Sequence, residues 1–119
     1  MAKLHQSEFI ASIKSRWPEL TPLINQEQDL LHFQVKHVRN LIQHQIDSHF
    51  ESDLRNTFRF IEKSFLSANS EVKNAIDVSI IEELEFRDRG KLNRSWAWEV
   101  MPSILQDLYV EFHQSPPNE

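Results

Sequence analysis

Apolar residues recur every three or four positions through most of the chain, which is the spacing of one face of an α-helix. The clearest run lies between residues 31 and 46, with steps of four, three, four and four residues. Each run predicts one amphipathic helix. The runs are Phe9, Ile10, Ile13 and Trp17; Leu31, Val35, Val38, Ile42 and Ile46; Leu54, Phe58, Ile61, Phe65 and Leu66; Val72, Ile76, Ile80 and Leu84; and Trp96, Val100, Ile104, Leu108 and Phe112.

Neighbouring apolar residues extend two of these predictions. Leu30, Phe33 and Leu41 widen the second run, so we expect that helix to be buried on more than one side. The third and fourth helices, about 52–67 and 70–86, are joined by a short turn and should form an antiparallel hairpin. The expected centre of that hairpin is Phe58, Phe65, Ile76 and Ile80.

Short polar residues, prolines and one glycine predict where the helices begin and end. Ser and Asp are preferred N-caps, proline breaks a helix, and glycine often follows the last turn. The expected boundaries are N-caps at Ser7, Asp29 and Ser70, breaks at Pro18 and Pro22, a kink or split at Pro102 in a helix of about 94–113, and a C-cap at Gly90.

We therefore predict an all-α protein of about five helices, with antiparallel hairpins in an irregular bundle or a short α-solenoid-like stack. The 119 residues suit a single helical domain, 1–119, with 1–6 and 114–119 frayed. One glycine in the chain argues against sheet hairpins and phosphate-binding loops. The absence of cysteine excludes disulfides, thiolate metal sites and thiol nucleophiles.

Charge narrows the class of partner. The formal net charge is −5, whereas affinity for nucleic acid comes mostly from Lys and Arg, so we expect no nucleic-acid partner. A basic protein is a better match, since opposite charges speed association. No apolar run exceeds three residues, and the first six residues lack the apolar core of a secretory signal. We expect no membrane partner and a cytoplasmic location.

Six histidines raise the question of a metal site. Two ligands on one helix should be three or four residues apart. His32 and His37 are five residues apart, as are His44 and His49. We expect the histidines to flank the apolar runs, and we expect neither a metal nor any other cofactor.

Residue types used in catalysis are present, but not in catalytic patterns. Ser79 lacks a surrounding Gly-x-Ser-x-Gly turn. Glu82 and Glu83 are adjacent, so on a helix their side chains diverge by about 100° and do not share a proton. We therefore expect neither an enzyme nor a small-molecule substrate.

A basic loop precedes two tryptophans. Basic residues beside aromatic rings can bind single-stranded nucleic acid, but a solvated loop leading into a core helix is the favoured interpretation in an acidic chain. Trp96 and Trp98 are two residues apart and cannot share a helix face, so one of them, with Trp98 as our candidate, should suit a protein interface. The basic residues are Arg87, Arg89, Lys91 and Arg94.

The fourth helix also has an acidic side. Asp77, Glu82 and Glu85 lie off its apolar run and should face outward. Fixed carboxylates on a rigid helix suit a basic ligand, although an ordinary solvated helix surface explains them equally well. These three residues and Trp98 are the candidate partner-binding residues.

Three segments between Leu54 and Leu84 form a set. Residues 58–62 are an aromatic-rich helix ending in Ile-Glu, residues 70–76 contain Val-x-Asn-Ala, and residues 79–84 end in Glu-x-Leu. Together they resemble a group of small all-helical bacterial proteins of unassigned function, whose members look like immunity proteins of contact-dependent or polymorphic toxin systems. Residues 29–46 resemble the group more loosely, because they are unusually rich in Gln and His.

The resemblance implies a function class that composition does not supply. We expect an immunity protein that binds a cognate, basic toxin domain, for instance a nuclease, in the cytoplasm and blocks its active site. The alternative is a non-enzymatic regulatory or adaptor protein that acts through protein contacts as a homodimer.

Overall fold

In the computed structural model, which describes residues 3–117, every regular element is helical. The prediction of an all-α fold is confirmed. The helices outnumber the predicted five, because residues after Pro18 form a short helix and Pro102 splits the last one. The elements are α1 (Gln6–Arg16), the 3-10 turn η1 (Pro18–Leu20), α2 (Thr21–Gln26), α3 (Leu31–Asp47), α4 (Glu51–Ser67), α5 (Ser70–Ser79), the 3-10 turn η2 (Ile81–Glu83), α6 (Ser95–Val100) and α7 (Ser103–His113).

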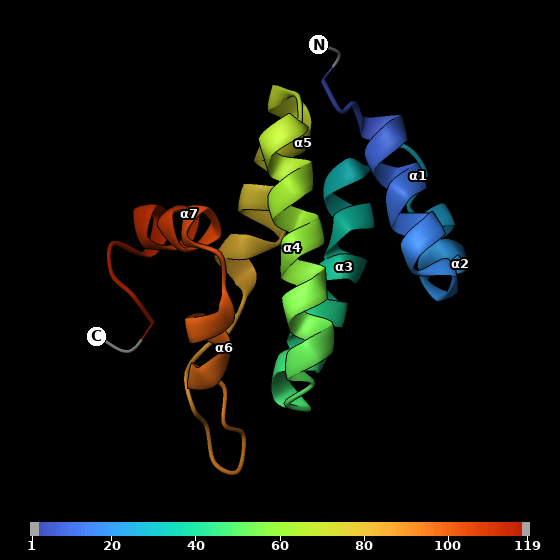
Figure 1. Cartoon of the computed structure of the whole chain (residues 1–119). Coiled ribbons are helices and arrows are strands. Elements are labelled where there is room, and N and C mark those ends of the chain that lie inside the picture. Colours follow the sequence, from blue (N-terminus) through green and yellow to red (C-terminus); the bar gives the residue numbers. More distant parts are fainter. Residues whose placement is uncertain (1–2, 118–119) are drawn as a thin grey trace.

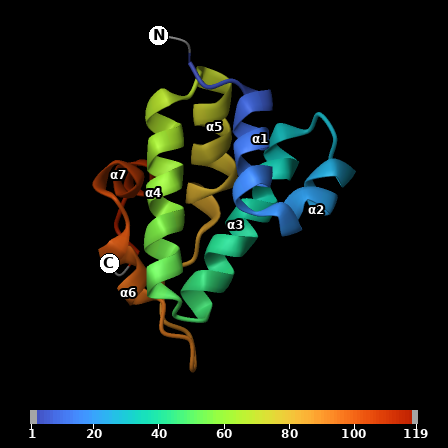
Figure 2. The same cartoon turned by 45° about the vertical axis from the view of Figure 1, so that its right-hand side comes forward.

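The helices α3, α4 and α5 form the centre of the molecule. The chain reverses between α4 and α5, so these two form the predicted hairpin (Figure 2). On one side of α4 lie α1 and α2, and on the other side lie α6 and α7 (Figure 1). Because α3 packs against α1, α2, α4 and α5, the arrangement is an irregular bundle rather than a linear stack of hairpins.

The apolar runs of α3 and of the chain from α5 to Leu84 are buried as predicted. All five members of the α3 run are at most 6% exposed, and those of the following run are at most 2% exposed. Phe58 is also buried and joins this core from α4.

Other core predictions are wrong in part. Leu30 and Phe33 are about half exposed, so these two residues do not widen the buried face of α3. On α4, Phe65 is only half-buried and Leu66 is exposed. In the last two helices, the predicted run is half-buried or, at Phe112, exposed. Two runs there share a four-residue spacing, so periodicity alone does not distinguish them. The buried one lies one residue later, at Ala97, Met101, Leu105 and Tyr109.

Two helices begin beside the predicted N-caps rather than at them. α1 follows His5, whose backbone N–H donates to Glu8 Oε1 at 3.1 Å, so Ser7 already lies within the helix. α5 is capped by Asn69, whose Oδ1 accepts from the N–H of Val72 at 2.9 Å, in place of Ser70.

Asp29 and Gly90 have turn geometry rather than the capping roles that we expected. Asp29 has a left-handed φ of 64°, which Asp tolerates better than most residues, and α3 begins after Leu30. Gly90, with φ of 58°, lies in the turn of a small hairpin in which Arg89 and Leu92 exchange backbone hydrogen bonds. Glycine adopts this conformation without the strain of a Cβ atom.

Both ends of the described chain, where we expect fraying from the sequence, make hydrogen bonds to other parts of the chain. The N–H of Leu4 donates to the carbonyl of Ser67 at 2.8 Å. Pro117 is buried, and its carbonyl accepts from Arg87 Nε at 2.7 Å. Residues 1–2 and 118–119, which the prediction also covered, lie outside the described residues. No helix in the described part is long and apolar enough to cross a membrane.

A glutamine fixes the extended chain that follows η2. Gln43, on α3, accepts from the N–H of Glu85 at 2.9 Å and donates to the carbonyl of Glu85 at 3.1 Å. The side-chain amide thus pairs with both backbone groups of one residue. This contact sets where the chain leaves η2 and, with it, how the acidic residues around η2 lie.

Candidate functional site

Acidic side chains gather where α7 packs on η2, beside α5. Asp77 lies on α5, Glu82 on η2 and Glu111 on α7. We call these three residues the acidic cluster. Asp77 and Glu82 are half-buried and Glu111 is exposed. The cluster depends on the packing of α7 against η2, since that contact brings Glu111 to residues about thirty positions earlier in the chain.

The acidic cluster raises the pKa of two of its carboxyl groups. Burial raises the pKa of Asp77, and the charge of Glu111 raises it further. Burial also raises the pKa of Glu82, and the charges of Asp77 and Glu83 raise it further. The charge of His113 lowers the pKa of Glu82. Both shifts mean that the folded protein resists ionisation at these positions.

Among residues 3–117, no Lys or Arg forms an ion pair with a member of the acidic cluster. The ion pairs of these residues join Arg55 to Glu51, Arg94 to Asp47, and Arg39 to Glu83. The last pair borders the acidic cluster, but its 3.7 Å separation between Arg39 Nε and Glu83 Oε2 is too long for a hydrogen bond.

His113 holds the end of α7 over η2. Its Nε2 donates to the backbone carbonyl of Glu82 at 3.0 Å, and its ring stacks on Tyr109, one helical turn earlier, at 4.0 Å between centroids. These contacts fix the imidazole beside the acidic cluster. This role was not predicted from the spacing of the histidines.

Glu85 lies apart from the acidic cluster, so the predicted acidic face divides in two. Its side chain is exposed and borders a hollow of about 350 Å³, which is lined also by Asp88 and three arginines of the basic loop. Beyond η2 the chain is extended rather than helical, which carries Glu85 away from Asp77. Only Asp77 and Glu82 of the predicted trio are brought together.

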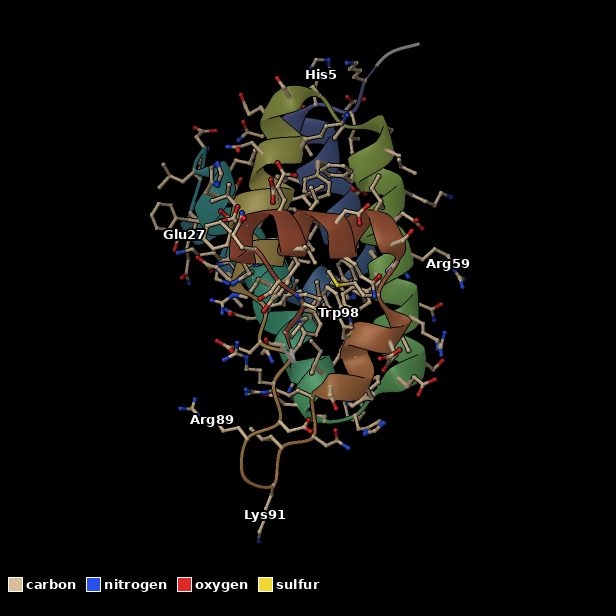
Figure 3. The ribbon with its side chains drawn as sticks, turned by 90° about the vertical axis from the view of Figure 1, so that its left-hand side faces the viewer. His5, Glu27, Arg59, Arg89, Lys91 and Trp98 are labelled. Atoms are coloured by element: carbon tan, nitrogen blue, oxygen red, sulfur yellow. The ribbon has the colours of Figure 1, made fainter. Side chains whose placement is uncertain are left out.

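Trp98 is part of an aromatic cluster rather than a projecting side chain. Its ring lies 5.4 Å from Phe86 and 5.3 Å from Tyr109, and both contacts are edge-on. In Figure 3 it lies between the ribbons of α6 and α7. Trp96 is also half-buried and stacks on His49 at 4.1 Å.

The remaining histidines make dispersed contacts. His32 Nδ1 lies 2.6 Å from the hydroxyl of the buried Ser79, which joins α3 to α5. His5 Nδ1 lies 3.1 Å from the side-chain amide of Asn69. Among residues 3–117, no group of three or more His, Asp or Glu residues is placed to hold a metal ion.

Three hollows lie around α1. The largest of the three, about 940 Å³, is lined by amide and hydroxyl side chains, including the buried Gln34, together with charged and apolar ones. Another, of about 510 Å³, lies between α1 and α4 and holds Arg16, Arg59 and Lys63, and a third of about 440 Å³ adjoins it. Sequence reasoning missed this basic site and also Glu111. The spacing of Arg59 and Lys63, one turn apart on α4, was the available signal.

Comparisons with known proteins identify the family of this chain, but they identify no relative of known function. No curated protein and no solved structure shows significant similarity to this chain. A family defined by a domain of unknown function, DUF7674, matches residues 10–115, which run from α1 to just beyond α7. The match covers most of the chain, and the chain therefore belongs to the DUF7674 family.

Proposed function

We propose that this chain is a non-enzymatic inhibitor that binds a toxin domain through the acidic cluster and blocks the active site of the toxin, as immunity proteins do. One observation carries the proposal. Asp77, Glu82 and Glu111 are held together by packed helices without an ion-paired Lys or Arg in the described chain. Like charges held together oppose folding, and a basic partner would relieve this repulsion by supplying the missing cations.

The charge of the whole chain supports the same class of partner. The net charge of −5 favours encounter with a basic protein. A toxin that cleaves nucleic acid needs a basic groove for its substrate, and an acidic inhibitor can occupy that groove. We place the encounter in the cytoplasm, where such a toxin would meet its substrate.

The test is binding and growth protection with the toxin domain encoded beside this chain in the genome. The variant Asp77→Asn, Glu82→Gln, Glu111→Gln removes the charge of the acidic cluster. The control variant Glu19→Gln, Glu27→Gln, Glu99→Gln makes the same change in net charge, from −5 to −2, at side chains without a hydrogen bond or ion pair among residues 3–117. Both proteins should keep the helical circular dichroism of the parent.

We expect the cluster variant to bind the toxin at least tenfold more weakly by calorimetry and to lose protection, while the control keeps both. Because exposed carboxylates act mainly on association, the difference should shrink as salt is raised. Equal binding by the cluster variant and the control would remove the acidic cluster from the interface. A parent chain that neither binds nor protects would refute the immunity proposal itself.

A second function is favoured by the distribution of charge. The acidic cluster includes Glu111 of α7 and the basic hollow includes Arg16 of α1, and these two helices lie on opposite sides of α4 (Figure 1). Two copies could therefore pair acidic to basic surface. This pairing would suit a regulatory or adaptor homodimer. Sedimentation at low and high salt distinguishes the two functions, since a salt-sensitive dimer supports the adaptor and a monomer at all concentrations contradicts it.

A further inference from the structure

The hollow between α1 and α4 is basic, although the protein as a whole is acidic. Its charged lining residues are Arg16 from α1 and Arg59 and Lys63 from α4, and no carboxylate lines it. None of the three cations takes part in an ion pair within residues 3–117. Three unpaired cations around one hollow repel each other, and an anionic ligand would remove that repulsion.

Arg16 is oriented by aromatic rings. Its guanidinium lies 5.4 Å from the ring centroid of Trp17 and 5.3 Å from that of Phe60. Its other contact is a long hydrogen bond of 3.4 Å from Nη2 to the carbonyl of Asn56. A guanidinium positioned by rings keeps donors free for a carboxylate, which it can bind through two parallel hydrogen bonds.

A second hollow continues from the first. Arg16 and Asn56 line both, so the two hollows adjoin at this pair. The lining of this second hollow is mostly polar but includes the apolar side chains of Trp17, Leu41 and Phe50, and Phe50 is 47% exposed. A large exposed aromatic ring in a hollow is typical of a surface that packs against a partner.

The second hollow contains a buried polar atom without a partner. Gln45 is 6% exposed, and its Oε1 has no hydrogen-bond partner among the described residues. Leaving a buried polar atom unpaired is unfavourable, and a backbone N–H of a bound peptide would supply the missing donor.

We propose that these two hollows, the α1–α4 groove, bind an extended acidic peptide segment of another protein. Its Asp or Glu side chains meet Arg16, Arg59 and Lys63, and an aromatic or aliphatic side chain packs on Trp17 and Phe50. The groove determines which end of the peptide is acidic, because Glu19 and Asp53 line the second hollow and repel acidic residues there.

Charge and shape favour a peptide over other anions. Nucleic acid would need many phosphate contacts, whereas the α1–α4 groove supplies three cations on a chain of net charge −5. A single inorganic anion would not pack against the aromatic rings of the second hollow and would not donate a hydrogen bond to Gln45. A peptide combines carboxylates, an apolar side chain and backbone N–H groups, which complement the cations, the aromatic rings and the unpaired amide oxygen that line the groove.

The experiment is a selection of random 12-residue peptides displayed on phage, with the full chain as target. The groove variant is Arg16→Gln, Arg59→Gln, Lys63→Gln. The control variant is Arg55→Gln, Arg89→Gln, Lys91→Gln, which changes the net charge by the same amount at exposed positions outside the α1–α4 groove. Neither variant alters the acidic cluster, so this test is independent of toxin binding.

We expect the parent to enrich peptides in which Asp or Glu lies near an aromatic residue. A selected peptide, labelled with fluorescein, should bind the control with the affinity of the parent and the groove variant at least tenfold more weakly. Substituting Phe50→Ala should weaken binding at least fivefold without changing the dependence on salt.

Several outcomes would overturn the proposal: no enrichment over the library, enriched peptides without acidic residues, or equal binding by the groove variant. Tighter binding of a labelled 12-residue oligothymidylate than of any selected peptide would assign the groove to nucleic acid. Displacement of the peptide by millimolar inorganic phosphate as effectively as by unlabelled peptide would reduce it to an anion site. Concentration-dependent dimerisation lost only in the groove variant would make a second copy of this chain the occupant.

Discussion

Arg94 donates two hydrogen bonds to the carboxylate of Asp47, from Nε to Oδ1 at 2.6 Å and from Nη2 to Oδ2 at 3.1 Å. The pair joins the residue before α6 to the last residue of α3. Both side chains are largely covered, with exposed fractions of 12% for Arg94 and 27% for Asp47. This bidentate contact connects the α6–α7 side of the molecule to the central helices, and α7 in turn carries Glu111.

Replacing Asp47 with Asn should therefore destabilise the protein. Asn keeps the size of the side chain but loses one charge and one of the two parallel bonds. Hydrogen bonds to charged groups contribute about 1.5–3 kcal/mol, so the free energy of unfolding in urea should fall by about that amount. The exposed Asp107, replaced in the same way, is the control and should change stability by less than about 0.5 kcal/mol. Equal losses in the two variants would mean that the pair contributes little.

The same pair should make part of the stability depend on pH. The hydrogen bond from Arg94 holds the pKa of Asp47 below its ordinary value. A lowered pKa in the folded state gives stability that is present above the unfolded-state pKa, about 3.9, and is lost as pH falls through the folded-state value. The difference in unfolding free energy between the parent and Asp47→Asn should be constant near neutral pH and should shrink in acid. A difference that grows in acid would contradict the assignment.

Two phenylalanines on α4 test where the core lies. Phe58 is 1% exposed, whereas Phe65 is half-buried beside Lys73, whose Nζ lies 5.5 Å from its ring centroid. Phe58→Ala should cost about 3–5 kcal/mol in urea melts. Phe65→Ala should cost about half as much, because part of its ring is exposed to solvent. A larger loss for Phe65 than for Phe58 would reverse the assignment of the core.

The sequence predicts features of this fold that depend on neighbours along one helix. The run from Leu31 to Ile46 is buried because only one helical face can hold it, and Pro102 splits a helix because its ring prevents continuation. The predictions failed where two registers fit equally well. Trp96 and Ala97 each begin a run with four-residue spacing, and tertiary packing selects the run that starts at Ala97.

The sites depend on contacts between distant residues, which a single sequence does not specify. Glu111 lies near Asp77 because α7 packs on η2. Arg16 lines the same hollow as Arg59 and Lys63 because α1 lies beside α4. One continuous helix would hold Glu85 near Asp77, but the chain becomes extended after η2 and separates them. The acidic side of the fourth helix was thus identified in part, and the α1–α4 groove was not.

Zinc should leave the stability unchanged. The histidines point to different partners, such as Ser79 for His32 and Trp96 for His49, and do not converge. A ligand present at 100 times its dissociation constant would add about 2.7 kcal/mol to the stability of the folded state. The melting temperature in 100 μM zinc should therefore equal that in EDTA, and a clear rise with zinc would require a site assembled by more than one chain.

Removing the charge of Asp77 should stabilise the protein at neutral pH, because burial and Glu111 raise the pKa of this carboxyl. A raised folded-state pKa means that the ionised group opposes folding above that pKa, and that the penalty disappears as pH falls through it. Asp77→Asn should raise the free energy of unfolding by about 0.5 kcal/mol at pH 7, which is the usual size of a like-charge contact on a helix surface.

The gain in stability from Asp77→Asn should fall in high salt and vanish in acid, where both forms are uncharged. In the Glu111→Gln background the same substitution should gain less, since part of the repulsion is already gone. Urea melts of the four proteins in this cycle measure the coupling. If Asp77→Asn instead lowers stability at pH 7, the carboxylate has a favourable partner within the fold, and the acidic cluster would no longer be a surface that needs cations from another protein.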